Sequence, residues 1–209
     1  MKQAISIPSG AVKLPGDLTL PEGAKGLVLF VHGSGSSRLS PRNVFVADVL
    51  NDAGIATLLF DLLTEKEDET YETRFDIDLL TERLLDATHW VEQQDNLKKL
   101  ALGYFGASTG AAAALQAAAK VGDKAKAVVS RGGRPDLTGE VLPDVVAPTL
   151  LIVGGDDDVV IGMNQEAYDQ MTCEKQLEIV PGATHLFEEP GTLEQVSELA
   201  KDWFLTHLK

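Results

Sequence analysis

The amino-acid sequence predicts an α/β fold in which a mostly parallel central sheet has helices on both faces. Short apolar runs that end at glycine or a small polar residue alternate with longer helix-like segments through most of the chain. This alternation is typical of parallel sheets, because their strands are joined by helices that pack on either face. A chain of 209 residues is long enough to bury a sizeable core. We therefore expect residues 1–209 to form a single domain.

The first half of the chain supplies a hairpin and then the first parallel strands. Residues 1–20 predict an antiparallel hairpin, and the apolar run 26–31 predicts a buried parallel strand. Helices are expected over 41–53 and 75–91, and in the second of these the apolar residues recur on one face. The charged run Glu65–Glu72 between a strand and a helix predicts an exposed loop near the mouth of a site.

The second half continues the same alternation. Its apolar runs predict strands over 100–105, 127–130, 149–153 and 176–180. An alanine-rich helix is expected over 109–121, and a final helix opens at Thr192, where Gln195 stands in capping-box spacing. The stretch between residues 131 and 148 is too short for a large cap domain, so the edge of the sheet should be open.

The pentapeptide Gly106-Ala107-Ser108-Thr109-Gly110 joins a predicted strand to the alanine-rich helix. A serine on a sharp strand-to-helix turn, with glycines that let the backbone bend, projects its hydroxyl from the edge of the sheet as a nucleophile. The alternative is an ordinary glycine turn between a strand and a helix. Ser108 is therefore the candidate nucleophile.

Possible partners of this serine follow in the order Ser, Asp, His. Three aspartates, Asp156 to Asp158, follow the strand 149–153, and His185 follows the strand 176–180. A serine hydroxyl must lose its proton to an imidazole as it attacks, and a carboxylate must hold that imidazole in the correct tautomer. The other histidines occupy a loop start, a helix middle and the last helical turn, where structural roles are expected. They are His32, His89 and His207.

An oxyanion hole requires two backbone N–H groups that point at the developing negative charge. One is expected from Thr109, directly after the nucleophile. The other is expected from the loop 32–37, where Ser34 is the first choice and Gly33 the near rival. This loop lacks the spacing and the Lys-Ser/Thr ending of a phosphate-binding loop, which excludes that interpretation.

Together these motifs resemble those of the α/β-hydrolase superfamily, and the chain is most similar to its dienelactone hydrolase-like family. The resemblance implies a serine-nucleophile hydrolase of the α/β-hydrolase fold that uses no cofactor and no metal. It selects Asp157 as the acid, because the family has an aspartate three residues before a valine in this loop, as Asp157 and Val160 are here. Asp158, Asp156 and the more distant Asp136 are the alternatives. Dienelactone hydrolases proper use a cysteine nucleophile, whereas position 108 is serine.

Charge and composition exclude several classes of partner. The formal net charge is −14, and such a surface repels nucleic acids and anionic membranes. No apolar stretch is long enough to span a bilayer, and residues 1–8 lack the apolar core of a signal peptide. The one cysteine, Cys173, cannot form an internal disulfide. These features favour a cytoplasmic protein.

Four of the six arginines follow predicted strands near the site, namely Arg38, Arg42, Arg131 and Arg134. They are candidates for binding an anionic group on the substrate through guanidinium forks. The alternative is that they pair with the many acidic side chains, which is common at surfaces.

The sequence thus predicts hydrolysis of a small carboxylic ester, thioester or lactone by a monomer or homodimer. A catalytically silent hydrolase fold kept for binding or regulation is the alternative.

Overall fold

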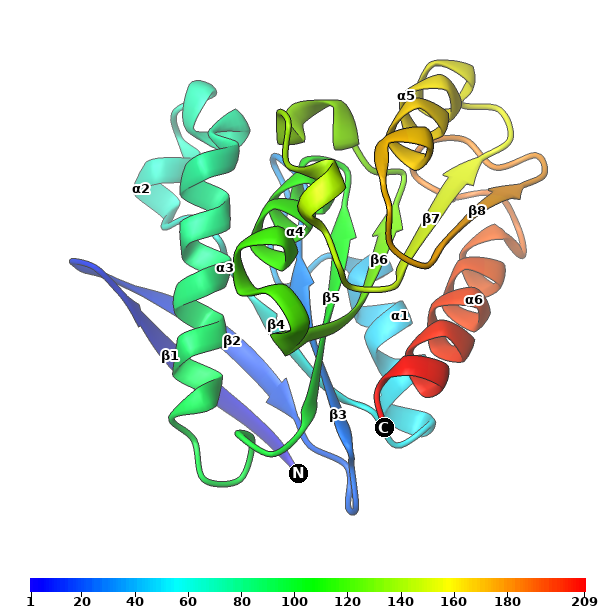
Figure 1. The fold of residues 1–209 in the computed structure, drawn as a ribbon. Helices are drawn as coiled ribbons and strands as arrows, with labels where there is room; N and C mark the ends of the chain where they lie inside the picture. The colour runs from blue at the N-terminus through cyan, green and yellow to red at the C-terminus, as the bar shows by residue number, and fades with distance from the viewer.

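The computed structural model describes all 209 residues and is built on an eight-stranded sheet in the order β1-β2-β4-β3-β5-β6-β7-β8 (Figure 1). The pairs β1–β2 and β2–β4 are antiparallel, and every other neighbouring pair is parallel. This confirms the predicted fold class, including the N-terminal hairpin. The strands are β1 (Lys2–Ser9), β2 (Val12–Thr19), β3 (Gly26–Val31), β4 (Ala56–Phe60), β5 (Ala101–Ala107), β6 (Ala125–Arg131), β7 (Thr149–Gly154) and β8 (Lys175–Val180).

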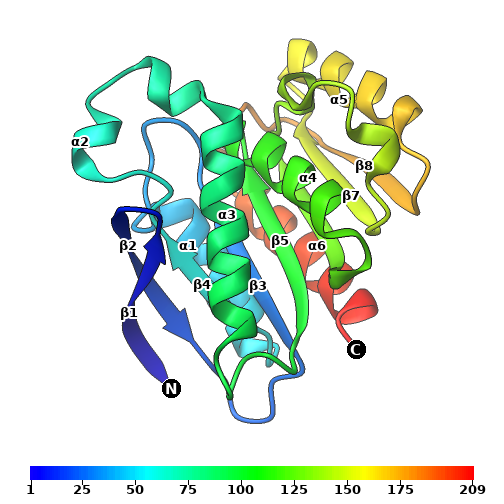
Figure 2. The same ribbon diagram turned by 60° about the vertical axis from the view of Figure 1, so that its left-hand side comes forward.

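Helices cover both faces of the sheet. Helices α3, α4 and α5 lie on one face, and α1 and α6 lie on the other (Figure 2). Each face has its own apolar core, one packed against α3 and α4 and the other against α1 and α6. No helix is both long and apolar enough to cross a membrane. The five longer helices are α1 (Pro41–Asp52), α3 (Ile77–Glu92), α4 (Thr109–Val121), α5 (Asp158–Gln170) and α6 (Thr192–His207).

The segment between β4 and α3 is more ordered than the exposed loop that its charge predicts. It forms the short helix α2 (Glu65–Asp68) and a 3-10 turn over Glu72–Phe75. Thr64 and Glu67 form a reciprocal capping box, and the Glu67 carboxylate also lies 2.6 Å from the Arg83 guanidinium of α3. The expected helix over 75–91 begins only at Ile77, because the Asp76 carboxylate accepts a hydrogen bond from the Leu79 N–H and caps the helix there.

The first turn of α4 approaches the end of β3 very closely. A Cβ atom added to Gly110 would lie 2.1 Å from the Val31 carbonyl oxygen and 2.5 Å from that of His32. Only glycine allows such an approach of a helix to a strand. The contact places the start of α4 directly beside the loop that follows β3.

A buried histidine supports that loop. The Nε2 atom of His32 accepts a hydrogen bond from the Leu62 N–H at 3.0 Å, so Nδ1 carries the proton and donates to the Gly33 carbonyl at 3.0 Å. Burial lowers the pKa of His32, and the Gly33 hydrogen bond opposes it only in part. The neutral imidazole therefore joins the end of β3 to the segment after β4, as expected of a structural histidine.

We expect Gly110→Ala to destabilise the protein strongly, because the added methyl group would overlap two carbonyl oxygens. Overpacking of this kind costs about 1–3 kcal/mol or more in free energy of unfolding. Gly162→Ala is the matched control, since Gly162 lies within α5 and an added Cβ meets nothing within 4 Å. Chemical denaturation should show Gly162→Ala at or above wild-type stability, by up to about 1 kcal/mol. Equal stability of the two variants would contradict the close approach.

His32 makes stability depend on pH with a defined sign. The folded-state pKa lies below that of the unfolded chain, so the unfolded state binds more protons as the pH falls. The contribution of His32 to the free energy of unfolding is therefore complete above the pKa that this histidine has in the unfolded chain. Below that pKa the contribution is lost by about 1.4 kcal/mol per pH unit. Chemical denaturation at several pH values between 8 and 5 should show that the free energy of unfolding falls less steeply for His32→Asn than for wild type. The Gly162→Ala control changes no titratable group and should keep the wild-type slope.

Candidate active site

Ser108 occupies a strained turn between β5 and α4. Its φ angle is positive, at 52°, which is uncommon for residues other than glycine. The surrounding backbone enforces it, because the Ser108 N–H donates to the Arg131 carbonyl at 3.2 Å and the Ser108 carbonyl accepts from the Arg134 N–H at 3.1 Å. Gly106 allows the helix to fold back, since a Cβ there would lie 2.5 Å from the Cα of Ala111. Strain that the neighbouring backbone maintains in this way is common at functional sites.

His185 lies between Ser108 and Asp157. Its Nδ1 atom is 2.7 Å from Oδ2 of Asp157, and its Nε2 atom is 3.4 Å from Oγ of Ser108. The carboxylate holds the proton on Nδ1, which leaves Nε2 as the acceptor that faces the serine hydroxyl. The distance to the serine is at the long end of the range for a hydrogen bond. The structure thus brings together the three side chains selected from the sequence.

The rival carboxylates lie elsewhere. Asp156 and Asp158 flank Asp157 but are exposed, and the carboxylate that accepts the hydrogen bond from the imidazole is that of Asp157. Asp136 instead accepts two hydrogen bonds from the Arg134 guanidinium, at 2.8 and 2.7 Å.

Gly132 shapes the other side of the imidazole. It directly follows β6 with a φ angle of 51°, and a Cβ there would lie 3.5 Å from Nδ1 and Cε1 of His185. The end of β6 therefore packs against the His185 ring, although β6 itself supplies none of the three candidate catalytic side chains. No sequence motif around Gly132 indicates that this residue lies beside the His185 ring.

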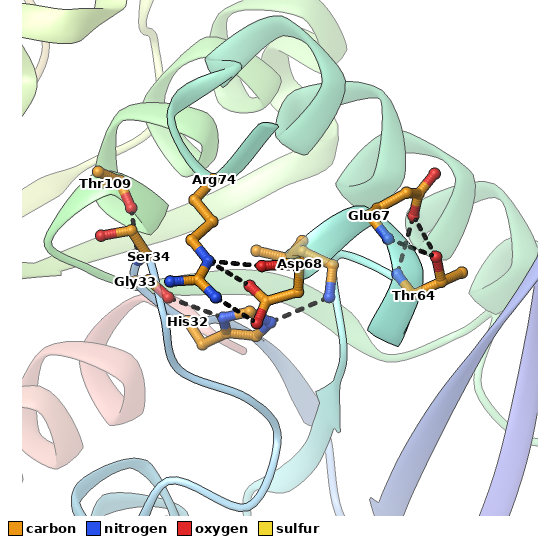
Figure 3. Close-up of polar contacts among 9 residues, drawn as sticks. His32, Gly33, Ser34, Thr64, Glu67, Asp68, Arg74 and Thr109 are labelled. Atoms are coloured by element: carbon orange, nitrogen blue, oxygen red, sulfur yellow. Dashed lines mark hydrogen bonds and ion pairs between the residues drawn. The ribbon is translucent and has the colours of Figure 1, made fainter. Parts of the chain in front are cut away.

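The two predicted oxyanion donors are neighbours, but one of them already has an acceptor. The Ser34 N–H donates to Oγ1 of Thr109 at 2.9 Å (Figure 3). Its rival Gly33 also lies close to the nucleophile, because a Cβ at Gly33 would be 3.1 Å from the Cβ of Ser108. Thr109 is the first residue of α4, where the helix dipole adds partial positive charge. Which loop N–H faces the substrate stays a prediction.

Arg74 also lies at this loop, although sequence reasoning did not select it. Its Nε donates to the Asp68 carbonyl at 2.8 Å and pairs with the Asp68 carboxylate at 3.0 Å (Figure 3). A Cβ added to Gly35 would lie 3.7 Å from its Nη1. The segment 64–75 therefore borders the loop 33–35, which agrees with its expected place at the mouth of the site.

The four arginines singled out from the sequence do not form one cluster. Arg38 pairs with Asp17 at 3.0 Å and with Asp61 at 2.6 Å. Arg134 pairs with Asp136, and Arg42 pairs with Glu188 at 3.1 Å. Pairing with acids, the alternative considered above, therefore accounts for three of the four. Arg131 has no such partner.

The protein is similar to a dienelactone hydrolase of known structure from Anabaena variabilis. The two chains share 55% identity over 100% of this chain and 99% of the other, with a TM-score of 0.98. Est1E from Butyrivibrio proteoclasticus shares only 19% identity over 97% of this chain and 98% of its own, but its TM-score of 0.84 shows the same fold.

Curated relatives are considerably longer than this chain. A Mycobacterium tuberculosis (strain H37Rv) protein, named provisionally as a phosphoribosyl transferase, is 58% identical over 206 residues, which are 99% of this chain and 46% of the relative. The chain thus spans about half the length of the curated relatives it matches.

The sequence profile of the dienelactone hydrolase family matches residues 35–207. This match includes Ser108, Asp157 and His185. The chain belongs to the dienelactone hydrolase family.

Proposed function

We propose that this protein is a serine hydrolase that cleaves a small carboxylic ester, thioester or lactone through an acyl-enzyme. The observation that carries the proposal is the position of His185, which faces Asp157 through Nδ1 and Ser108 through Nε2. This geometry provides a nucleophile, a base and a carboxylate that orients the base.

In the first step, Oγ of Ser108 bonds to the acyl carbon while Nε2 of His185 takes the hydroxyl proton. The carbonyl electron pair moves onto oxygen, and the Asp157 carboxylate stabilises the imidazolium. The oxygen re-forms its double bond as the alcohol or thiol leaves, and His185 gives the leaving group its proton. In a lactone the leaving hydroxyl stays attached to the acyl chain.

In the second step, a water molecule attacks the acyl-enzyme. His185 accepts one proton of the water while the water oxygen bonds to the acyl carbon. His185 then returns that proton to Oγ of Ser108 as the acid leaves. The oxyanion of both steps is held by the N–H of Thr109 and by an N–H of the loop 33–34. Ser34 can contribute only if its N–H turns from, or is shared with, the Thr109 hydroxyl. No cofactor takes part in these steps.

The surroundings of Ser108 favour small or exposed substrates. The connection between β6 and β7 contains only two 3-10 turns, Pro135–Thr138 and Leu142–Asp144, so no cap domain covers the site there. Arg74 and the segment 64–75 border the loop 33–35 on one side. The site is therefore better suited to short acyl groups than to long ones that need a deep tunnel.

The length of the M. tuberculosis relative favours a second candidate function. Because this chain matches only 46% of that protein, a hydrolase-fold segment could act there as a binding or regulatory module beside another activity. In that role the Ser108 hydroxyl would not need to be activated.

Ser108→Ala should abolish turnover of short p-nitrophenyl esters and labelling by a fluorophosphonate probe. Alanine has the same Cβ at the strained turn, so folding should be unchanged. Intact mass spectrometry measures the labelling, and circular dichroism checks the fold. A folded wild-type protein that is inert to both the esters and the probe would favour the binding module. An equally active Ser108→Ala variant would refute Ser108 as nucleophile.

Asp157→Asn should lower kcat on the same esters by about 10⁴-fold, because the amide favours the wrong imidazole tautomer. Asp156→Asn is the matched control, since it removes the same charge from the neighbouring exposed residue, and its kcat should stay within about threefold of wild type. A large effect at Asp156 together with a small one at Asp157 would reassign the acid.

A further inference from the structure

A buried amide in α5 donates hydrogen bonds to two backbone carbonyl oxygens. The Asn164 side chain is fully buried, and its Nδ2 atom lies 2.8 Å from the Val160 carbonyl oxygen and 3.0 Å from that of Gly133. Carbonyl oxygens only accept hydrogen bonds, so Nδ2 is the donor to both. Val160 belongs to the first turn of the same helix, whereas Gly133 lies in the connection between β6 and β7. Asn164 thus joins two segments that are far apart in the sequence.

The same amide leaves its oxygen atom unpaired. Oδ1 of Asn164 is buried and has no hydrogen-bond partner within the protein. An unpaired buried polar atom lowers stability, and an apolar residue at this position would avoid that cost. Packing alone therefore does not account for an asparagine here. The distinctive contribution of this side chain is the bond from Nδ2 to the Gly133 carbonyl.

The start of the β6–β7 connection contacts both the candidate nucleophile and the candidate base. The Arg131 carbonyl accepts the N–H of Ser108 at 3.2 Å, and the Arg134 N–H donates to the Ser108 carbonyl at 3.1 Å. Gly132 faces the His185 ring, because a Cβ there would lie 3.5 Å from Nδ1 and Cε1. A displacement of this connection would therefore move the nucleophile relative to the imidazole.

Gly133 itself is enclosed on two further sides. A Cβ added there would lie 2.0 Å from Oγ of Ser130 on β6 and 2.8 Å from the Cβ of Ala111 on α4. Gly133 therefore rests directly on the sheet and on α4, while Asn164 of α5 holds its carbonyl. Closely packed groups have few alternative arrangements. The position of α5 is thus tied to that of the β6–β7 connection.

Helix α5 also carries the candidate acid. Asp157 is the N-cap residue of α5, and its carbonyl accepts the N–H of Ile161 at 2.9 Å. The Asn164 amide bonds to the carbonyl of Val160, so it is attached to the same first turn. A shift of this turn would move the Asp157 carboxylate away from the His185 ring, which lies 2.7 Å from it through Nδ1.

We propose that Asn164 is a positioning residue that sets the alignment of the Asp157 carboxylate with the His185 imidazole. It does so by fixing the first turn of α5 to the Gly133 carbonyl, and it touches neither the substrate nor a reacting atom. Catalytic groups act only when they are well aligned, and a misplacement of about 1 Å can lower the rate by about 10²-fold. This inference rests on the proposed hydrolase function and names a residue that supports the three candidate catalytic side chains.

Asn164→Ala and Asn164→Ser test the proposal with a short p-nitrophenyl ester. A serine hydroxyl can still bond to the Val160 carbonyl four residues before it, but it is too short to reach Gly133. Both variants should lower kcat by about tenfold to a hundredfold and leave KM nearly unchanged, because alignment fails after the substrate has bound. Asn164→Ser also serves as the test if the alanine variant does not fold. Wild-type kcat in Asn164→Ser would overturn the proposal.

Gln116→Ala is the matched control. Gln116 is a buried amide of α4, and its Nε2 donates to the Thr138 carbonyl at 3.2 Å, further along the same connection. The substitution removes the same kind of hydrogen bond, so the melting temperature should fall as it does for Asn164→Ala. Its kcat should stay near that of wild type. An equal fall in kcat for the two variants would show general loosening and overturn the positioning role.

A measurement that needs no turnover separates this proposal from the hydrolase proposal. In the Ser108→Ala background, the proton that Nδ1 of His185 donates to Asp157 should give a resonance far downfield in the proton NMR spectrum. Adding Asn164→Ala should shift this resonance upfield, whereas adding Gln116→Ala should not. An unchanged resonance in the Asn164 variant would overturn the positioning role. A wild type without ester turnover, together with a resonance that responds to Asn164→Ala, would refute the hydrolase proposal alone.

Discussion

The close contact between the first turn of α4 and the end of β3 determines the geometry of the whole site. Because Gly110 lies against the carbonyl oxygens of Val31 and His32, the turn before α4 must be sharp. Ser108 takes a positive φ angle there, and hydrogen bonds to the Arg131 carbonyl and from the Arg134 N–H hold it in place. The same contact brings the loop after β3 beside Thr109. One approach of helix to strand therefore sets both the strained nucleophile and the neighbouring oxyanion loop.

The order of the strands explains why residues distant in sequence meet at this point. The neighbours β5, β6 and β7 all end at the same edge, where they deliver Ser108, Gly132 and the Asp157 loop, while β8 leads into the loop of His185. In a parallel sheet the carboxyl ends form the crevice where ligands bind.

The alternation of apolar runs and helices was sufficient to predict the sheet, the hairpin and the loops that carry Ser108, Asp157 and His185. The local sequence pattern failed to predict the structure where hydrogen bonds of individual side chains determine it. The Thr64–Glu67 capping box orders a run whose charge predicts a loop, and the Asp76 cap moves the start of α3. The hydrogen bond from Ser34 to the Thr109 hydroxyl, the position of Arg74 and the pairing of each arginine depend on distances between segments far apart in the chain, which spacing along the sequence does not contain.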